Sequence, residues 1–424
     1  MLLPIYLFLM IYAPKIAGLY DVVGVVSAVI IVHAFFKTAV EPVDVKRLRL
    51  KSFALLGFLL LYSLFLTIVN QNPGHWQVIR FIRIIVHFMG GYALMRLYYV
   101  KYYDRMGEKV LVHLFWAIAT HAVIMLLMFI SPAINSFIMN TLKVTLTREM
   151  AGVRVRGLTA SLDALSGLQG FGVIIFPFVI RYLRGFKAIL GSVAVVLIAC
   201  SVLISGRTGI VLVMLLFPIT FLFTMRYILG TIVKIGVASV FFVILISLVV
   251  PRLDVWYKIV PTIERTKQLI SSSEEGGGLK SGVIQKLMND YKTGWPSNPA
   301  LFLFGNSTSG RTDWYFVPHD PGYILDVYGV GMFGSLLILS FYFMCIRCAV
   351  RCIRSGFPVG MAALLFAVQT LLIHGKVHYL LARNSFTVSV VFLVLTVYLH
   401  TIQSDLSEYG DEYLADLADE QGSF

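Results

Sequence analysis

The stretch "SFALLGFLLLYSLFLTIV", residues 52–69, carries no charged side chain and is long enough to cross the hydrocarbon of a bilayer as a helix, about 30 Å. Similar apolar segments recur along the chain of 424 residues, which is 58% hydrophobic and 13% charged and has a mean hydropathy of +0.84. A helix satisfies its backbone hydrogen bonds internally, as lipid requires. The sequence therefore predicts an all-α polytopic membrane protein.

These segments predict about twelve transmembrane helices. The expected spans are 2–14, 17–36, 52–69, 77–99, 109–130, 165–180, 188–204, 208–225, 229–250, 322–346, 358–375 and 384–401. Spans one to nine occupy 1–250 and include an outer loop at 131–164. A large and partly helical periplasmic loop occupies 251–321, and the last three spans lie in 322–401. Residues 402–424 form an acidic cytoplasmic tail.

The distribution of lysine and arginine predicts the orientation. "VDVKRLRLK" at 43–51 and "RYLRGFK" at 181–187 are strongly basic, whereas "NQNPGHW" at 70–76 has neither lysine nor arginine. Basic connections face the cytoplasm in membrane proteins, so we expect both termini to be cytoplasmic. The net charge of +13 then reflects topology and contact with the lipid bilayer, and it is weak evidence for a nucleic-acid partner.

Three of the four cysteines, Cys345, Cys348 and Cys352, are spaced to share one helix face. A zinc site needs a fourth ligand. We therefore expect reduced thiols at a lipid or helix contact, and we predict no metal site.

Span 4 begins with "HWQVIRFIRIIVHF", in which Arg80, Arg83 and His87 follow the i, i+3, i+7 spacing of one helix face. Arginine near a membrane interface can extend its head group to phospholipid. A shared face near the outer end equally predicts a site for an anionic ligand, and we favour that interpretation.

Other outer segments add further basic groups. Arg154 and Arg156 precede span 6, and Arg207 lies in a short turn, "SGRTGI", between spans 7 and 8. The connection "IHGKVHYLLARN" between spans 11 and 12 contributes Lys376, His378 and Arg383. Cations are disfavoured in short outer loops, so their accumulation predicts a polyanionic ligand such as a lipid-linked pyrophosphate, whose oxygens arginine binds in a bidentate fork.

The segment "RTDWYFVPHDPGYILDVYGVGMFG", residues 311–334, brings Arg311, His319, Asp320 and Asp326 to the start of span 10. His319 or Asp320 is the expected proton acceptor, although "HDPG" is also a good helix-entering turn without any chemical role. Asp326 is expected to orient a sugar hydroxyl or to pair with an arginine. Glycines 329, 331 and 334 are expected to serve helix packing.

These residues resemble the bacterial O-antigen polymerase and ligase superfamily. The resemblance rests on "RVRGLTASLDALSG", "SGRTGI", "NPALFLFGNS" and "HDPGYILDVYGVGMFG". An arginine followed after ten residues by a glycine, a feature of the polymerases, occurs in both large outer loops, as Arg156 with Gly167 and as Arg311 with Gly322.

The resemblance implies a C-type glycosyltransferase architecture in the bacterial inner membrane. It implies a donor glycan on undecaprenyl pyrophosphate, an acceptor that is a lipid-linked repeat unit, a separate chain-length-regulating co-polymerase, and neither metal nor cofactor. His319 matches the acceptor-activating histidine of the ligases, and Asp320 stands where those proteins commonly have asparagine.

Transfer of sugar from a pyrophosphate needs cations for the leaving group and a base for the acceptor hydroxyl. Arg207 and Arg156 are the expected leaving-group cations, and His319 or Asp320 the expected base. The other expected binding residues are Arg154, Arg80, Arg83, Arg311, Lys376, His378, Arg383 and Asp326.

Two other functions stay open at this point. An O-antigen ligase would move the same donor to the lipid A core. A transporter or flippase of lipid-linked saccharide would usually show inverted halves with charge at the midplane, and the sequence shows no internal repeat.

Overall fold

The structure, a computed structural model, describes residues 2–12, 22–37, 41–71, 75–142, 155–159, 162–206, 208–225, 282–308, 311–312, 315–316 and 320–422. Side chains are described for these residues except 142, 162–164, 282–284, 311–312, 315–316 and 404–422. Several predicted features lie outside the described residues: the span 229–250, the first part of the large outer loop, Arg154, Arg207 and His319.

The described chain is almost entirely helical. Its helices are α1 (Leu2–Tyr12), α2 (Val22–Phe36), α3 (Val43–Val69), α4 (Trp76–Tyr102), α5 (Met106–Ile130), α6 (Pro132–Leu142), α7 (Leu162–Val179), α8 (Phe186–Ser205), a helix at Thr208–Met225, α11 (Gly282–Thr293), α12 (Pro299–Phe304), α13 (Gly322–Arg354), α14 (Pro358–His374) and α15 (Arg383–Gly422). Strands β1 (Arg311–Thr312) and β2 (Tyr315–Phe316) form a short antiparallel pair. Short 3₁₀ turns, η1 (Tyr103–Arg105) and η2 (Ile180–Tyr182), follow α4 and α7.

Seven helical segments of the described part are long and apolar enough to cross a membrane. One of them, Trp76–Ile130, is divided by η1 into α4 and α5, and α1, α2 and α14 are shorter apolar helices. Helices coincide with every predicted apolar segment that the described residues cover. The prediction of a helical polytopic membrane protein is therefore confirmed at this level.

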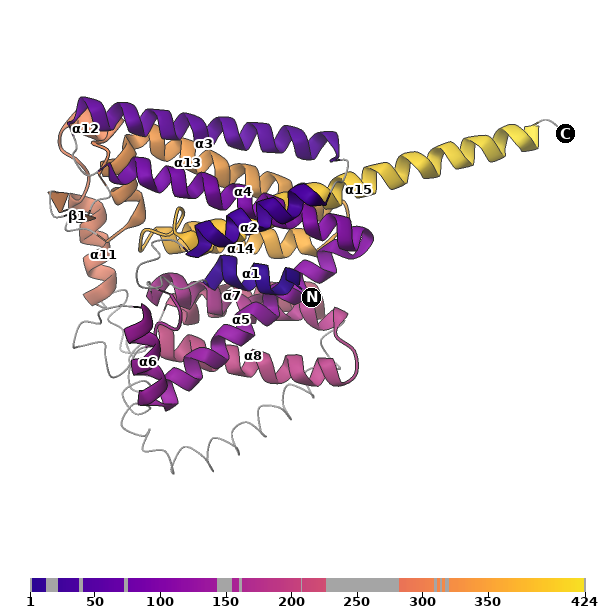
Figure 1. The fold of residues 1–424 in the computed structure, drawn as a ribbon, viewed down its shortest axis with the longest axis horizontal. Helices are drawn as coiled ribbons and strands as arrows, with labels where there is room; N and C mark the ends of the chain where they lie inside the picture. Colours follow the sequence, from indigo (N-terminus) through magenta and orange to yellow (C-terminus); the bar gives the residue numbers. More distant parts are fainter. Residues whose placement is uncertain are drawn as a thin grey trace.

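The helices form one elongated bundle with two distinct ends (Figure 1). At one end, which we call the loop end, lie α6, α11, α12 and the β1–β2 pair; at the other, α1 begins and α15 projects beyond the bundle. The described parts of the predicted outer loops lie at the loop end.

Helix α15 lies at the centre of the bundle. In its apolar span 89% of the residues are buried, against 33% for α3, and it packs against α4, α13 and α14. Its sequence is rich in serine and threonine, whose hydroxyls donate to carbonyls of the preceding turn, as from Ser389 to Ser385 at 2.8 Å and from Thr396 to Leu393 at 2.9 Å. Small residues with satisfied hydroxyls let neighbouring helices approach closely.

Helix α13 is broken at Gly331, which has φ of 69°. The chain after α12 fills the break: Asn306 N donates to Tyr328 O at 3.0 Å and Ser307 N donates to Gly329 O at 2.8 Å. A Cβ atom on Gly331 would lie 2.2 Å from the carbonyl oxygen of Leu303. Gly331 was expected to serve packing between helices, and its close approach to the α12 backbone agrees with this. The glycine also permits a backbone conformation that L-residues rarely adopt.

The segment that fills the break is also bonded to α3 and α4. The Ser307 hydroxyl lies 2.6 Å from that of Thr67, and Gln77 Nε2 donates to Thr308 O at 2.5 Å. The first part of α13, which carries Asp326, is thereby held against the start of α4.

Candidate functional site

A buried cluster of ionisable groups lies at the loop end, where α4 and α13 begin and α14 ends. We call Arg80, Asp326, His374 and His378 the Asp326 cluster. His378 Nε2 lies 2.6 Å and Arg80 Nη1 3.6 Å from Asp326 Oδ1, and His374 Nε2 lies 3.0 Å from Asp326 Oδ2. The Asp326 side chain is only 3% exposed. A carboxylate so deeply buried is stable only with such partners.

The protonation of His374 follows from its neighbours. Its Nδ1 accepts the backbone N–H groups of Tyr379 at 2.9 Å and Leu380 at 3.1 Å. A neutral imidazole then carries its hydrogen on Nε2, the nitrogen that faces Asp326. His374 therefore serves the carboxylate as a donor, and it also fixes the connection between α14 and α15.

Glycine at the start of α13 makes room for this histidine. A Cβ atom on Gly322 would lie 2.4 Å from Cε1 of His374. The Tyr323 ring meets the His374 ring edge to face, with centroids 4.6 Å apart. The sequence "PGYILD" thus places a small residue, an aromatic ring and the carboxylate around one imidazole.

His378 is the member of the cluster most open to its surroundings, with 22% of its side chain exposed. Its Nε2 lies between Asp326 Oδ1, at 2.6 Å, and Arg80 Nη2, at 2.5 Å. Among the described residues, its Nδ1 has no hydrogen-bond partner. Burial, and next the Arg80 guanidinium, lower the pKa of His378 to about 4. The imidazole is therefore neutral at pH 7 and can accept a proton.

Lys376 connects the same loop to a second predicted element. Its Nζ donates to the Thr208 hydroxyl at 2.7 Å, and Thr208 follows directly after Arg207. On the other side of Arg207, the Ser166 hydroxyl donates to Gly206 O and accepts from Gly209 N, both at 2.7 Å. The residues that flank Arg207 are thus bonded to α7 and to the loop that carries His378.

Asp320, one of the two predicted bases, lies apart from the Asp326 cluster. Its carboxylate pairs with Lys286 of α11 at 3.0 Å, and the two side chains are 44% and 61% exposed. An exposed pair of this kind contributes little to stability because water screens it.

The remaining predicted residues are distributed around the loop end. Arg156 is half-buried, and burial lowers the pKa of its guanidinium. Arg383 is half-buried at the start of α15, and the backbone of Arg311 pairs with that of Phe316.

Arg83 differs in burial from Arg80 and His87. It is exposed, whereas Arg80 is half-buried and His87 is buried. The three side chains thus differ in burial along this part of α4, and the role predicted for Arg83 toward a ligand stays a prediction.

Two residues of the site were not among the predicted ones. They are His374, in the connection that supplies Lys376 and His378, and Gln77, whose Oε1 lies 3.5 Å from Arg80 Nη1. The signal for Gln77 was its position one turn before Arg80 on α4.

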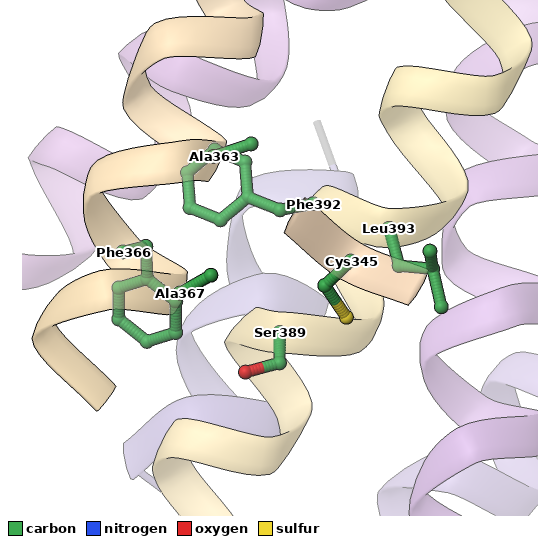
Figure 2. Close-up of a pocket in the computed structure, with 7 residues that line it drawn as sticks. All are labelled: Cys345, Ala363, Phe366, Ala367, Ser389, Phe392 and Leu393. Atoms are coloured by element: carbon green, nitrogen blue, oxygen red, sulfur yellow. The ribbon is translucent and has the colours of Figure 1, made fainter. Parts of the chain in front are cut away.

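An internal cavity between α13, α14 and α15 has room for about one water molecule. Figure 2 shows its lining, which is apolar apart from Cys345 and Ser389. A cavity this small does not hold a saccharide, so the Asp326 cluster is the stronger candidate. No group of metal ligands occurs among the described residues.

The Asp326 cluster combines a guanidinium, a carboxylate and two imidazoles whose side chains are mostly buried within the protein. Such groups can bind an anion and accept a proton. No protein family matches the chain, and no curated protein and no solved structure resembles it.

Proposed function

We propose that this protein is an integral-membrane glycosyltransferase that polymerises undecaprenyl-pyrophosphate-linked repeat units into O-antigen or a related surface polysaccharide. It has about twelve spans in a C-type arrangement, lies in the bacterial inner membrane with both termini in the cytoplasm, works without a metal, and acts together with a chain-length-regulating co-polymerase. The observation that supports the proposal most is the Asp326 cluster, because it joins a phosphate-binding side chain to proton acceptors at the loop end.

The arrangement suits the departure of a pyrophosphate. The donor is anchored in the bilayer by its lipid, so its pyrophosphate lies at the level where helices begin and end. Arg80 emerges at that level from the first turns of α4, and Lys376 and Arg383 belong to the adjoining connection. Guanidinium groups that stabilise developing charge on the leaving oxygen lower the barrier to transfer. Arg156 and Arg207 are expected to take part from the neighbouring segments.

An O-antigen ligase would use the same donor and the same cations. A deletion strain distinguishes the two functions. Loss of a polymerase leaves single repeat units attached to the lipid A core, whereas loss of a ligase leaves lipid-linked chains that are not attached.

A transporter of lipid-linked saccharide is the second candidate, and the broken helix α13 favours it. Transporters bind their cargo at discontinuous helices, and the break at Gly331 lies little more than one turn from the buried Asp326. Against it, the cluster lies at one end of the bundle and the sequence has no internal repeat.

Reconstitution tests the proposed function directly. The purified protein is placed in liposomes with undecaprenyl-pyrophosphate-linked repeat units, and chain length is measured by gel electrophoresis and mass spectrometry. Elongation without any other protein supports the polymerase, and unchanged repeat units that appear on the opposite leaflet support the transporter. The variants Arg207→Ala and Arg156→Ala are expected to shorten the chains, and normal chain length in both would contradict their assignment. Arg105→Ala, an exposed arginine paired with Glu108 at the opposite end of α4, is the control.

A further inference from the structure

His378 Nε2 faces one hydrogen-bond donor and one acceptor at nearly equal distances, 2.5 Å to Arg80 Nη2 and 2.6 Å to Asp326 Oδ1. A ring nitrogen either carries a hydrogen or offers a lone pair. It can therefore donate to Asp326 or accept from Arg80, but it cannot do both at once. The tautomer of His378 therefore sets which of its two neighbours, Arg80 or Asp326, it bonds to.

We propose that His378 is the base that deprotonates the acceptor hydroxyl, and that an anion drawing Arg80 away from it switches this base on. The inference rests on the proposed function, since the anion is the donor pyrophosphate. It differs from the sequence-based expectation, which gave the proton to His319 or Asp320.

In the inactive arrangement of this proposal, Arg80 donates to Nε2, so the hydrogen of the neutral ring is on Nδ1. Nδ1 then has no lone pair for a substrate. The enzyme without donor thus holds its base in an inactive tautomer.

A bound pyrophosphate draws Arg80 away from His378, because phosphate oxygens are better hydrogen-bond partners for a guanidinium than an imidazole nitrogen is. Once Arg80 turns to the pyrophosphate, Asp326 Oδ1 lacks its cationic neighbour and takes a hydrogen bond from Nε2–H. His374 Nε2 lies 3.0 Å from the other carboxylate oxygen, Oδ2, so Oδ1 is the oxygen nearer His378. The ring hydrogen leaves Nδ1 for water while another is taken up at Nε2, so the net number of protons is unchanged.

The transfer step forms one bond, breaks one bond and moves one proton. The acceptor hydroxyl loses its proton to His378 Nδ1 while its oxygen forms a bond to the anomeric carbon of the donor sugar. The bond from that carbon to the pyrophosphate oxygen breaks, and the electron pair stays on the pyrophosphate beside Arg80. His378 leaves the step as an imidazolium that Asp326 stabilises, and it releases the proton to water before the next cycle.

Exposure agrees with these roles. Of the two histidines, His374 is fully buried, with Nδ1 accepting two backbone N–H groups and Nε2 3.0 Å from Asp326 Oδ2, whereas His378 is 22% exposed and has Nδ1 without a partner among the described residues. His374 is accordingly a positioning residue, and His378 is the group that reaches the substrate.

Nitrogen-15 NMR of histidine-labelled protein in nanodiscs tests the switch, because the shifts of ring nitrogens differ between protonated and unprotonated states. The chain has nine histidines, and the His378 signals are identified by their loss in His378→Gln. Without ligand, Nδ1 is expected to be protonated. Addition of undecaprenyl pyrophosphate, the probe, is expected to move the hydrogen to Nε2. In Arg80→Ala, or in Arg80→Gln should that variant fold better, Nε2 is expected to be protonated without any ligand.

Binding is followed separately by the phosphorus-31 signals of the same samples, so that two failures can be told apart. Binding without a change of tautomer would overturn the role of His378 and leave the proposed function standing. Absence of binding would overturn both.

Activity supplies the second readout. His378→Gln keeps a donor near the position of Nε2 and removes the base, so elongation is expected to fall by about 10²-fold or more while pyrophosphate binding and thermal stability stay close to those of the parent. His374→Gln also keeps its donor to Asp326, and its defect is expected to be accompanied by lower stability, because two backbone N–H groups lose their acceptor. Full activity of His378→Gln would contradict the assignment.

Discussion

Asp326 is the residue on which the Asp326 cluster depends, because it is the one anion among a guanidinium and two imidazoles. Removal of one partner from a buried charge pair costs about 3–5 kcal/mol, since the other charge stays buried without compensation. Asp326→Asn keeps the shape of the side chain and removes only the charge. We expect it to lower the thermal stability of the detergent-solubilised protein clearly.

The control for this variant is Asp44→Asn, an exposed aspartate 4.0 Å from Arg47 at the other end of the bundle. A change at such a site is expected to stay within about 0.5 kcal/mol. The double variant Arg80→Gln with Asp326→Asn is expected to cost less than the two single changes together, because neither charge is then left alone. Strict additivity would contradict the pairing.

His378 also makes stability depend on pH, with a sign that follows from its pKa. The pKa is about 4 in the folded protein against an ordinary value of 6.5, so the unfolded chain binds the proton first as the pH falls. Stability is therefore lost between pH 6.5 and 4. The charged and titratable groups that face His378 are Arg80 from α4, Asp326 from α13 and His374 from α14.

The measurement is the unfolding temperature of the parent and of His378→Gln at several pH values. The parent is expected to lose more stability than the variant between pH 6.5 and 4, because glutamine does not titrate. Parallel curves would show that His378 does not have the lowered pKa.

Among single residues, the sequence predicted most members of the Asp326 cluster but not all of them. Arg80 and Asp326 were predicted because charged groups are rare in apolar segments, and His378 was predicted because basic groups accumulate in the outer connections. Arg83 was predicted with them because spacing alone does not tell which side of a helix faces protein. His374 was missed since its role depends on Gly322 and Tyr323, which only the packing of α13 against α14 brings to it.

Among the helices, the break in α13 can be tested by substitution of the glycine at which it occurs. Gly331→Ala introduces a side chain at φ of 69° and places its Cβ 2.2 Å from Leu303 O. The matched control is Gly356→Ala, which has φ of 81° and nothing within 4 Å of the added atom. Both variants carry the backbone strain, of order 1 kcal/mol or more, and only the first has the clash.

We therefore expect Gly331→Ala to lower the unfolding temperature further than Gly356→Ala does. It is also expected to free the segment after α12, which limited proteolysis near residue 305 would detect as faster cleavage. Equal effects of the two variants would mean that the contact with Leu303 is not maintained.

The residues on both sides of Arg207 are held by hydrogen bonds to Ser166 of α7. Ser166→Ala removes the hydroxyl that bonds to both Gly206 and Gly209, and the loss of two buried hydrogen bonds costs about 1–3 kcal/mol. Elongation is expected to fall more than stability, because the turn shifts while the bundle stays intact. Ser340→Ala, whose hydroxyl bonds only to Leu337 on the exposed side of α13, is the control.

Element positions were predictable because apolar segments must become helices in lipid. The predicted 109–130 and 188–204, for example, agree closely with α5 and α8. The break at Gly331 was not predictable, since the sequence there continues as an apolar helical pattern. Its cause is a contact with residues 303–307, which lie about 25 positions earlier in the chain.

For the whole molecule, the two ends of the bundle are expected to lie on opposite sides of the membrane. In a background without the four native cysteines, Lys286→Cys marks α11 at the loop end and Arg105→Cys marks η1 at the other, both at exposed positions. A membrane-impermeant maleimide applied to spheroplasts is expected to label the first at once and the second only after permeabilisation. The reverse pattern would invert the orientation and remove the site from the periplasmic side.

The connection between α14 and α15 is fastened at many points along its short length. Its backbone bonds to His374, the Tyr291 hydroxyl donates to Gly375 O at 2.7 Å, and Lys376 reaches Thr208. For protein engineering this connection is a poor place for an epitope tag, a fluorescent fusion or a loop graft, however short and accessible it looks in a topology diagram. Libraries intended to alter sugar selectivity should spare residues 374–382 and vary exposed positions of α11, such as Asn289 and Lys292, instead.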